Sequence, residues 1–323
     1  MSFHVRAECA TDPACGCPPR ERELREYIRW GVVVLDKPPD CTSRRAADAV
    51  RRALGAAKVG HGGTLDPAVT GVLPVLLDRA TPVAAVLLGC DKEYEGTLRL
   101  HGEVTDTELA AAVARLCGVI VQTPPRRSRV KRVPRERAVH VFEVTRRSGR
   151  QAEFRVRCQG GTYVRKLIHD LGQGLGCGAH MARLRRTHAG RFSLEQAVPR
   201  EAVEEAARRA LQGDEAVLRG LVHPADEVIC RVLPRLTVDD GAVEAVCSGA
   251  PLAVPGVCGL DEFEAGERIA MTTLKGELIG MGEARMDFGD VLAARHGIVA
   301  TPRRILMERG IYPAWGGGHV SAS

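Results

Sequence analysis

The feature that most restricts the possible folds of this chain is a change in sequence texture at about Leu233. Beyond it, "LPRLTVDDGAVEAVCSGAPLAVPGVCGLDEFEAGERIAMTTLKGELIGMGEARM" consists of short β-prone runs interrupted by glycine and proline. Such runs are typical of a small β-barrel or sandwich. A chain of 323 residues is also long enough for more than one domain. We therefore expect a domain boundary near residues 230–234, followed by a small β domain and a loose terminal tail.

The part before this boundary mixes strand and helix patterns. "GVVVLDKPPD" predicts a strand ended by prolines, and "SRRAADAVRRALG" predicts an amphipathic helix with Ser43 as N-cap and Gly55 at its end. "AVHVFEVTRR" and "QAEFRVRCQGG" predict a β-hairpin that turns at Gly149, and "TYVRKLIHDLGQGLG" has the apolar spacing of a helix. Without strict βαβ alternation, the order favours an α+β fold with a largely antiparallel sheet. Residues 1–23 predict an irregular arm.

Basic residues are concentrated in two runs. The net charge is only +6, but residues 126–150 carry ten lysines and arginines, and "RLRRTHAGR" spans residues 183–191. Clustered positive charges favour binding to a polyanion, because their contacts with phosphates release counterions. Either run alone could also be a solvated face. Together they indicate a nucleic-acid partner.

Several classes of protein are not supported. No apolar run could span a bilayer and no signal peptide is evident, so we expect a cytoplasmic protein with no membrane partner. The eleven cysteines should then be reduced, with Cys258 a small core residue. Cys9, Cys15 and Cys17 lack further ligands at metal-site spacing. Phosphate-loop, GxSxG and HExxH motifs are absent, so we expect neither cofactor nor metal.

One carboxylate stands out in the loop "KVGHGGTLDPAVTGVL". Asp66 follows three glycines, at positions 60, 62 and 63, and precedes Pro67. Glycine, aspartate and proline together most often make a turn. Glycines also let a backbone approach a ligand closely, and an acid on such a loop can act as nucleophile or base. Considered alone, the composition of this loop favours a structural turn over a catalytic site.

Three distant stretches together carry a family resemblance. "GHGGTLDPAVTGVLPV", "KEYEGTLRLHGEVTD" and "GTYVRKLIHDLGQGLGCGAHMARLRRTHAGRF" resemble the signature segments of the TruB class of pseudouridine synthases, and "GVVVLDKPPDCTS" resembles its N-terminal motif. The likeness is nearest to the archaeal and eukaryotic dyskerin branch, and it runs from about residue 25 to residue 312. The chain lacks the long lysine-rich extensions of the eukaryotic members, which suggests an archaeal-type protein.

The resemblance implies a role for each matching position. Asp66 matches the catalytic aspartate, and Arg165 matches the arginine that pairs with it. Tyr94 matches the tyrosine that packs against the target base, and Tyr163 matches the pocket tyrosine. The remaining substrate-binding positions are Leu184, which matches the leucine of the uracil pocket, and His61, which could position the RNA or serve loop packing.

The resemblance also implies domains and partners. We expect an N-terminal arm (1–23), a pseudouridine synthase core with a mixed, largely antiparallel sheet flanked by helices (24–232), an RNA-binding PUA β-barrel (233–315) and a tail (316–323). The partners implied are an H/ACA guide RNA, a target rRNA or tRNA, and the small accessory proteins of that complex. The alternatives are a stand-alone tRNA pseudouridine-55 synthase and an inactive RNA-binding scaffold, which the retained site residues argue against.

Overall fold

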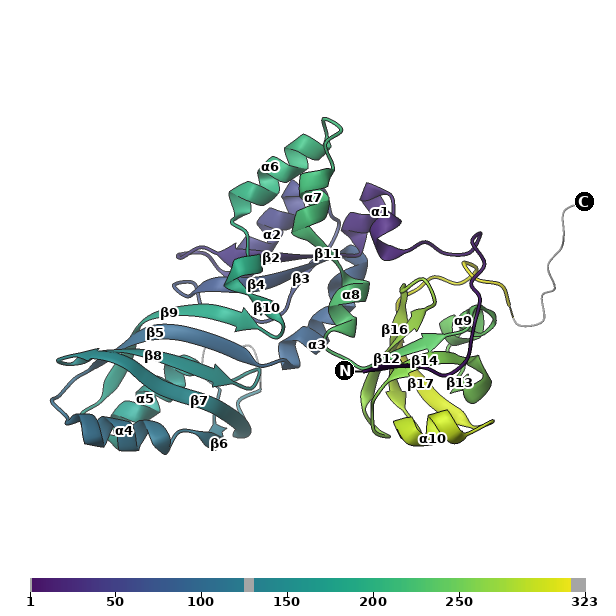
Figure 1. Cartoon of the computed structure of the whole chain (residues 1–323). Helices are drawn as coiled ribbons and strands as arrows, with labels where there is room; N and C mark the ends of the chain where they lie inside the picture. Colours follow the sequence, from purple (N-terminus) through teal and green to yellow (C-terminus); the bar gives the residue numbers. More distant parts are fainter. Residues whose placement is uncertain (1, 125–130, 315–323) are drawn as a thin grey trace, which may run out of the picture. The chain divides into compact units, whose positions relative to one another are not determined.

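The elements of this computed structural model form two units, one made of residues 32–222 and the other of residues 1–31 with 223–323 (Figure 1). The structure describes residues 2–124 and 131–314. The first unit, called the core unit below, contains the predicted mixture of strands and helices. The second, called the terminal unit, contains both ends of the chain.

The core unit is an α+β structure, as predicted. Its strands are β2 (Gly31–Lys37), β3 (Val59–His61), β4 (Thr70–Leu77), β5 (Lys92–Leu100), β6 (Gly118–Gln122), β7 (Arg135–Ser148), β8 (Gln151–Cys158), β9 (Ala179–Ala189) and β10 (Phe192–Ser193). Its α-helices are α2 (Ser43–Ala53), α3 (Ala84–Gly89), α4 (Asp106–Ala114), α5 (Val164–Gly174), α6 (Arg200–Ala210) and α7 (Ala216–Leu221), and two 3-10 helices lie at Asp78–Val83 and Leu194–Gln196. A short strand, β11 (Val222–Pro224), follows α7.

The sheet of the core unit runs in the order β2-β4-β9-β5-β8-β7-β6, with β3 beside β4 and β10 beside β9. All of these pairs are antiparallel except β4 with β9, which is parallel. The predicted hairpin is confirmed: β7 and β8 pair up to Ser148 and Gln151, and Gly149 takes a φ of 56° in the turn. Figure 1 shows α4 against β7 and α5 against β9.

The N-cap of helix α2 lies one residue before the predicted position. Thr42 is the N-cap, because its hydroxyl accepts a hydrogen bond from the Arg45 N–H at 3.1 Å. Ser43 is instead the first helical residue, is only 2% exposed, and directs its hydroxyl to a different segment of the chain. The prediction of Ser43 as N-cap was therefore wrong. The helix ends before Gly55, whose φ of 65° suits glycine.

The terminal unit is built mainly from short strands. They are β1 (Phe3–Val5), β12 (Arg235–Val238), β13 (Leu252–Ala253), β14 (Val257–Asp261), β15 (Arg268–Thr273), β16 (Leu278–Ala284) and β17 (Ile298–Ile305), in the order β1-β14-β12-β15-β16-β17-β13. Its α-helices are α1 (Leu24–Arg29), α8 (Ala225–Cys230), α9 (Asp240–Cys247) and α10 (Phe288–Ala293), with 3-10 helices at Pro19–Glu21 and Val254–Gly256. The short strands agree with the sequence prediction.

The N-terminal arm is more ordered than its sequence indicates. It contributes β1, which pairs with β14, and the Arg6 guanidinium donates to the carbonyl oxygens of Val291 and Ala294 at 3.1 and 2.9 Å. Cys9 forms a disulfide with Cys258. The expectation that all cysteines are reduced was therefore wrong, because the pairing of β1 brings residues 249 positions apart into contact. Cys9, Cys258 and Asp239 lie close enough together to be ligands of a metal ion, but both sulfur atoms are already bonded to each other in the disulfide.

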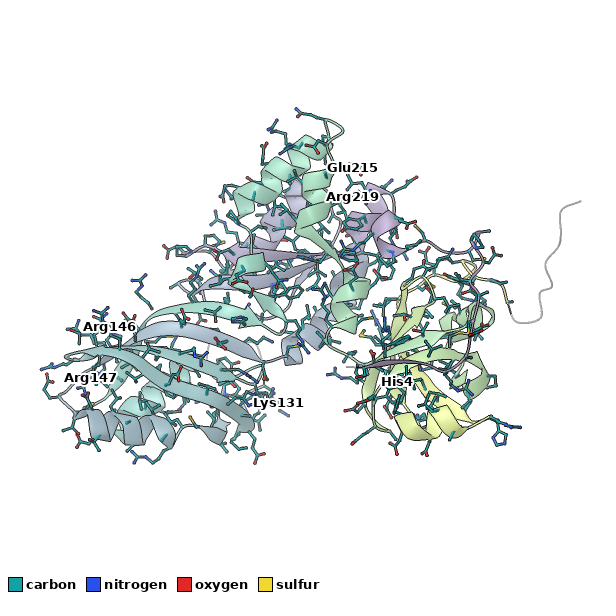
Figure 2. All side chains as sticks on the ribbon, in the orientation of Figure 1. His4, Lys131, Arg146, Arg147, Glu215 and Arg219 are labelled. Atoms are coloured by element: carbon teal, nitrogen blue, oxygen red, sulfur yellow. A yellow bond between two sulfur atoms is a disulfide. The ribbon has the colours of Figure 1, made fainter. Side chains whose placement is uncertain are left out.

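The two basic runs have different environments. Residues 126–130 of the first run lie outside the described residues, whereas Arg146 and Arg147 lie near the end of β7 (Figure 2). Arg146 is exposed, but Arg147 pairs with Asp106 at 2.5 Å. In the second run Arg186 is 1% exposed, so its assignment to a polyanion-binding surface was wrong. Within the described ranges, no helix is both long and apolar enough to cross a membrane.

Candidate active site

The loop that carries Asp66 joins β3 to β4, and its backbone is fixed on both sides of the carboxylate. On one side, the Ser43 hydroxyl accepts from the Leu65 N–H at 2.7 Å and lies 3.1 Å from the Leu65 carbonyl oxygen, to which it donates. On the other side, the Lys37 ammonium donates to the Pro67 carbonyl oxygen at 3.0 Å. Leu65 and Val69 are buried in the hydrophobic core. The loop therefore holds Asp66 between two anchored neighbours.

Lys37 is unusual because it is a fully buried cation. Its ammonium also donates to the carbonyl oxygens of Pro38 and Cys41, at 2.8 and 2.6 Å. Burial lowers the pKa of Lys37, which shows that desolvation opposes its charge. Three carbonyl acceptors offset that cost. The residue thus joins the end of β2 to the Asp66 loop.

Asp66 forms an ion pair with Arg165, which lies 99 positions further along the chain, at the start of α5. An Arg165 guanidinium N–H donates to the Asp66 carboxylate. The two side chains are 46% and 58% exposed, so a substrate can reach both of them. An oriented, accessible carboxylate is the arrangement that nucleophilic or acid–base catalysis requires. The pairing that the family resemblance implied is present.

Tyr163 is the residue immediately before α5, and Gln122 fixes its backbone. The Tyr163 N–H donates to the Gln122 side-chain oxygen at 2.9 Å, and the Gln122 amide donates back to the Tyr163 carbonyl oxygen at 3.3 Å. Gln122 is 3% exposed. Because α5 begins at this point, the same two bonds help to place Arg165.

Tyr94 and Leu184 lie on the core face of the sheet, 8% and 9% exposed. They belong to one hydrophobic cluster with Leu65 of the Asp66 loop and Val164 of α5. Gly96 makes room for Leu184 and for Phe154, because a Cβ atom there would lie 2.7 Å from Phe154 and 3.0 Å from Leu184. The cluster therefore connects the elements that carry the predicted site residues.

His61 lies on β3, at the start of the Asp66 loop, and is half-buried. Burial lowers the pKa of His61, and the nearby charges of Arg186 and Arg44 lower it further. Its Nδ1 atom is buried and has no hydrogen-bond partner among the described residues. The imidazole is thus held in its neutral form near neutral pH.

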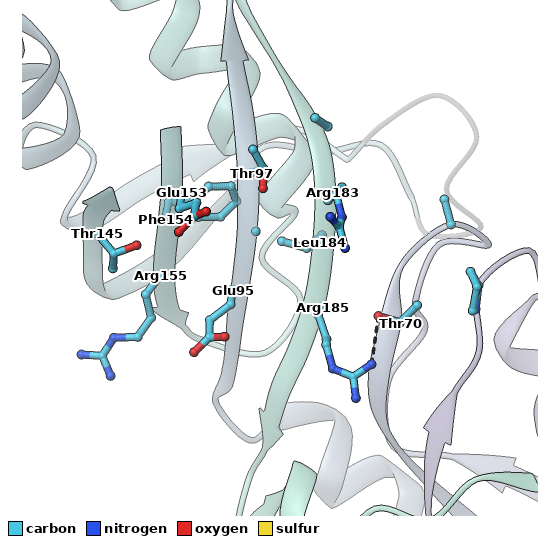
Figure 3. Close-up of a pocket in the computed structure, with 14 residues that line it drawn as sticks. Thr70, Glu95, Thr97, Thr145, Glu153, Phe154, Arg155, Arg183, Leu184 and Arg185 are labelled. Carbon is cyan, nitrogen blue, oxygen red and sulfur yellow. Dashed lines mark hydrogen bonds between the residues drawn. The ribbon is translucent and has the colours of Figure 1, made fainter. Parts of the chain in front are cut away.

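A groove of about 860 Å³ lies next to this site (Figure 3). Its lining includes Glu95 from β5 and Leu184 and Arg185 from β9. The Arg185 guanidinium donates to the Thr70 hydroxyl at 3.3 Å. Asp66 does not line the groove, but Leu184 does, and so does Ala68, two residues after Asp66.

Sequence reasoning missed Lys37 and Gln122, which hold the site residues in place, and it gave Ser43 a different role. A lysine at the end of the apolar run "GVVVLDK" was a signal for a buried cation. Gln122 ends the run "GVIVQ" in the same way. The bonds that reach the site segments join Lys37 to Pro67 and Gln122 to Tyr163, which are 30 and 41 positions away, so the pattern alone could not identify them.

Comparisons with known proteins give the class of this chain. A family model described as "TruB family pseudouridylate synthase (N terminal domain)" matches residues 51–164, and one described as "tRNA pseudouridylate synthase B C-terminal domain" matches residues 165–229. The models for the PUA domain and the DKCLD (NUC011) domain match residues 234–306 and 1–45. The chain is therefore a pseudouridine synthase, an enzyme of the isomerase class.

Curated relatives and solved structures narrow this class to a family. "Probable tRNA pseudouridine synthase B" from Methanopyrus kandleri is 46% identical, covering 97% of this chain and 93% of the relative, and the protein of the same name from Methanothermobacter thermautotrophicus is 45% identical, covering 97% of each. The chain belongs to the TruB family.

Two solved structures agree over nearly the whole chain. One is titled "Crystal Structure of a Cbf5-Nop10-Gar1 Complex" (TM-score 0.88, 39% identity, 97% and 96% of the two chains), and the other "Structure of H/ACA RNP bound to a substrate RNA containing 2'-deoxyuridine" (TM-score 0.87, 37% identity, the same shares). Both the predicted family and the predicted fold class are confirmed.

Proposed function

We propose that this chain converts uridine to pseudouridine in rRNA or tRNA as the catalytic subunit of an H/ACA guide ribonucleoprotein, with Asp66 as its catalytic carboxylate. The observation that carries the proposal is the accessible ion pair between Asp66 and Arg165 on an anchored loop. The guided mode is supported by the similarity to structures of H/ACA complexes that contain Nop10, Gar1 or a substrate RNA. We place this activity in the cytoplasm.

The reaction rearranges one bond and needs no net redox change. The bond between N1 of uracil and C1′ of the sugar breaks, the base turns, and C5 bonds to C1′. The proton on C5 is then lost to solvent and N1 takes up a proton, so the product is an isomer of the substrate. Asp66 acts covalently on the sugar carbon or through a glycal, and both routes need its carboxylate at the sugar. Arg165 orients that carboxylate. No step requires a metal or a nucleotide cofactor.

The target base must leave its RNA helix to reach Asp66, at a cost of a few kcal/mol. Tyr94 packs against the base and Tyr163 lines the pocket. Aromatic stacking contributes about 1–3 kcal/mol per base, which offsets the cost of extruding it. Leu184 lines the apolar side of the pocket and keeps water out. His61, held neutral by burial, positions the RNA strand beside the loop.

A second candidate is a stand-alone synthase that modifies uridine 55 in the TΨC arm of tRNA. The names of the curated relatives favour it, because each is called a probable tRNA pseudouridine synthase B. The two candidates share the chemistry and differ in whether a guide RNA is needed.

Release of tritium from RNA that contains 5-tritiated uridine tests both candidates. We expect release only when a guide RNA and the small accessory proteins are added, and we expect Asp66→Asn to abolish it while RNA binding stays within about twofold. Release from tRNA by the protein alone would favour the stand-alone enzyme. Equal release by the wild type and Asp66→Asn would refute the catalytic role of Asp66, and RNA binding without release by either protein would indicate a scaffold.

A further inference from the structure

Arg186 is a buried cation with an unusual set of partners. Its Nε donates to the Val72 carbonyl oxygen of β4 at 2.6 Å, and its Nη2 donates to the Gly63 carbonyl oxygen of the Asp66 loop at 3.1 Å. In the described part of the chain no carboxylate forms an ion pair with it. A buried guanidinium without an anion is costly and is retained only where other contacts offset the cost.

The third partner of Arg186 is Tyr94. The two residues are register partners on β9 and β5, so their side chains lie next to each other on one face of the sheet, and the guanidinium charge is close to the tyrosine hydroxyl. Burial lowers the pKa of Arg186, and the Tyr94 hydroxyl counteracts this effect. Burial also raises the pKa of Tyr94, so the phenol stays protonated.

The position of Arg186 leaves little freedom for movement. Its backbone lies so close to Gly71 of β4 that a Cβ atom on Gly71 would be 2.1 Å from the Arg186 carbonyl oxygen. At the other end of the side chain, a Cβ atom on Gly63 would lie 3.3 Å from Arg186 Nη1. The packing against Gly71 thus fixes the backbone of Arg186, and the backbone of the Asp66 loop packs against its guanidinium group.

We infer that Arg186 is a positioning residue that sets the Asp66 loop and Tyr94 in a fixed relation to each other. Gly63 precedes Asp66 by three residues, so a shift of this anchor is passed along the loop to the carboxylate. The inference rests on the proposed function, because it assumes that Asp66 and Tyr94 act on the same flipped uridine. Misplacing a reacting group by about 1 Å can cost roughly a hundredfold in rate.

The test measures single-turnover tritium release with the full chain in excess, together with whichever guide and accessory proteins the wild type needs. We expect Arg186→Met to lower the rate constant about ten- to a hundredfold, with RNA affinity unchanged within about twofold. Arg186→Lys should restore part of the rate, because an ammonium can still donate to both carbonyl oxygens. A merely structural role would lower the amplitude of release, through the folded fraction, and leave the rate constant unchanged.

Tyr94→Phe gives the matched comparison, because it removes only the hydroxyl that faces Arg186. We expect it to slow the reaction less than Arg186→Met, and the double variant to be no slower than Arg186→Met alone, since both changes break one arrangement. A wild-type rate constant for Arg186→Met, or rate losses that multiply in the double variant, would overturn the inference. If Arg186→Met does not fold, Arg186→Lys and the double variant Arg186→Lys with Tyr94→Phe decide in the same way. Absence of release by the wild type would count against the proposed function instead.

Discussion

Ser43→Ala should damage both the stability and the chemistry of the core unit, although it removes a single oxygen atom. The Ser43 hydroxyl satisfies the N–H and the C=O of Leu65, and both residues are buried. Each buried backbone group that loses its partner costs about 1–3 kcal/mol, so the loss of both should cost the variant about 2–6 kcal/mol. For a unit of this size the corresponding fall in melting temperature is roughly 5–25 °C.

Thr42→Ala is the control, because it removes the neighbouring hydroxyl at the start of the same helix. That hydroxyl caps α2, and among the described residues it forms no hydrogen bond with the Asp66 loop. Loss of the cap should cost about 1 kcal/mol and leave the rate constant of pseudouridine formation unchanged. Ser43→Ala should lower that rate constant about tenfold, because the residue before Asp66 is no longer anchored.

Calorimetry and single-turnover tritium release would measure the two effects separately. The expected pattern is a larger loss of stability for Ser43→Ala than for Thr42→Ala, and a loss of rate for Ser43→Ala alone. If the two variants melted at the same temperature and reacted at the same rate, the Ser43 hydroxyl would have no role in holding the loop.

Three further predictions concern the disulfide of the terminal unit, a buried lysine of the core unit and a glycine of β4. Cys9→Ser should lower the melting temperature of the terminal unit, by a loss of about 2–4 kcal/mol, and a reducing agent should do the same to the wild type but not to the variant, which lacks the bond to Cys258. Burial lowers the pKa of Lys92 from 10.5 to about 8. Between these pH values the unfolded chain therefore binds more protons than the folded chain, and the free energy of unfolding rises with pH. Denaturant titrations across this window should show the wild type gaining stability relative to Lys92→Met. Gly71→Ala should prevent folding of the core unit, as judged by circular dichroism, because its Cβ would clash with the Arg186 backbone and its φ of 103° disfavours other residues.

Local patterns predicted the elements of the core unit well, because they depend on neighbours in the sequence. The spacing in "TYVRKLIHDLGQGLG" predicted α5, and the turn residues around Gly149 predicted the β7–β8 hairpin. The same reasoning placed the cap of α2 at Ser43, because serine and threonine are nearly equivalent caps. The roles of Thr42 and Ser43 differ in the hydrogen-bond partner of each hydroxyl, and that partner is known only from the folded structure.

The site itself depended on long-range contacts that no local pattern contains. Asp66 and Arg165 are 99 positions apart, so no local pattern could indicate their ion pair, and only the family resemblance predicted it. Arg186 was misread as part of a charged surface because adjacent arginines on a strand point to opposite faces, and composition does not show which face is buried. The bond between Cys9 and Cys258 likewise required the pairing of β1 with β14.

The terminal unit has a consequence for the order in which the chain folds during synthesis. Strand β1 leaves the ribosome before the core unit, but its partner β14 is completed only after the whole core unit has been made. Domains generally fold as units while the chain is still being synthesised. The core unit can therefore fold first, as an insertion between two halves of another unit, while β1 waits unpaired. An exposed strand edge invites aggregation, so the nascent chain is most vulnerable in the interval before residue 257 emerges.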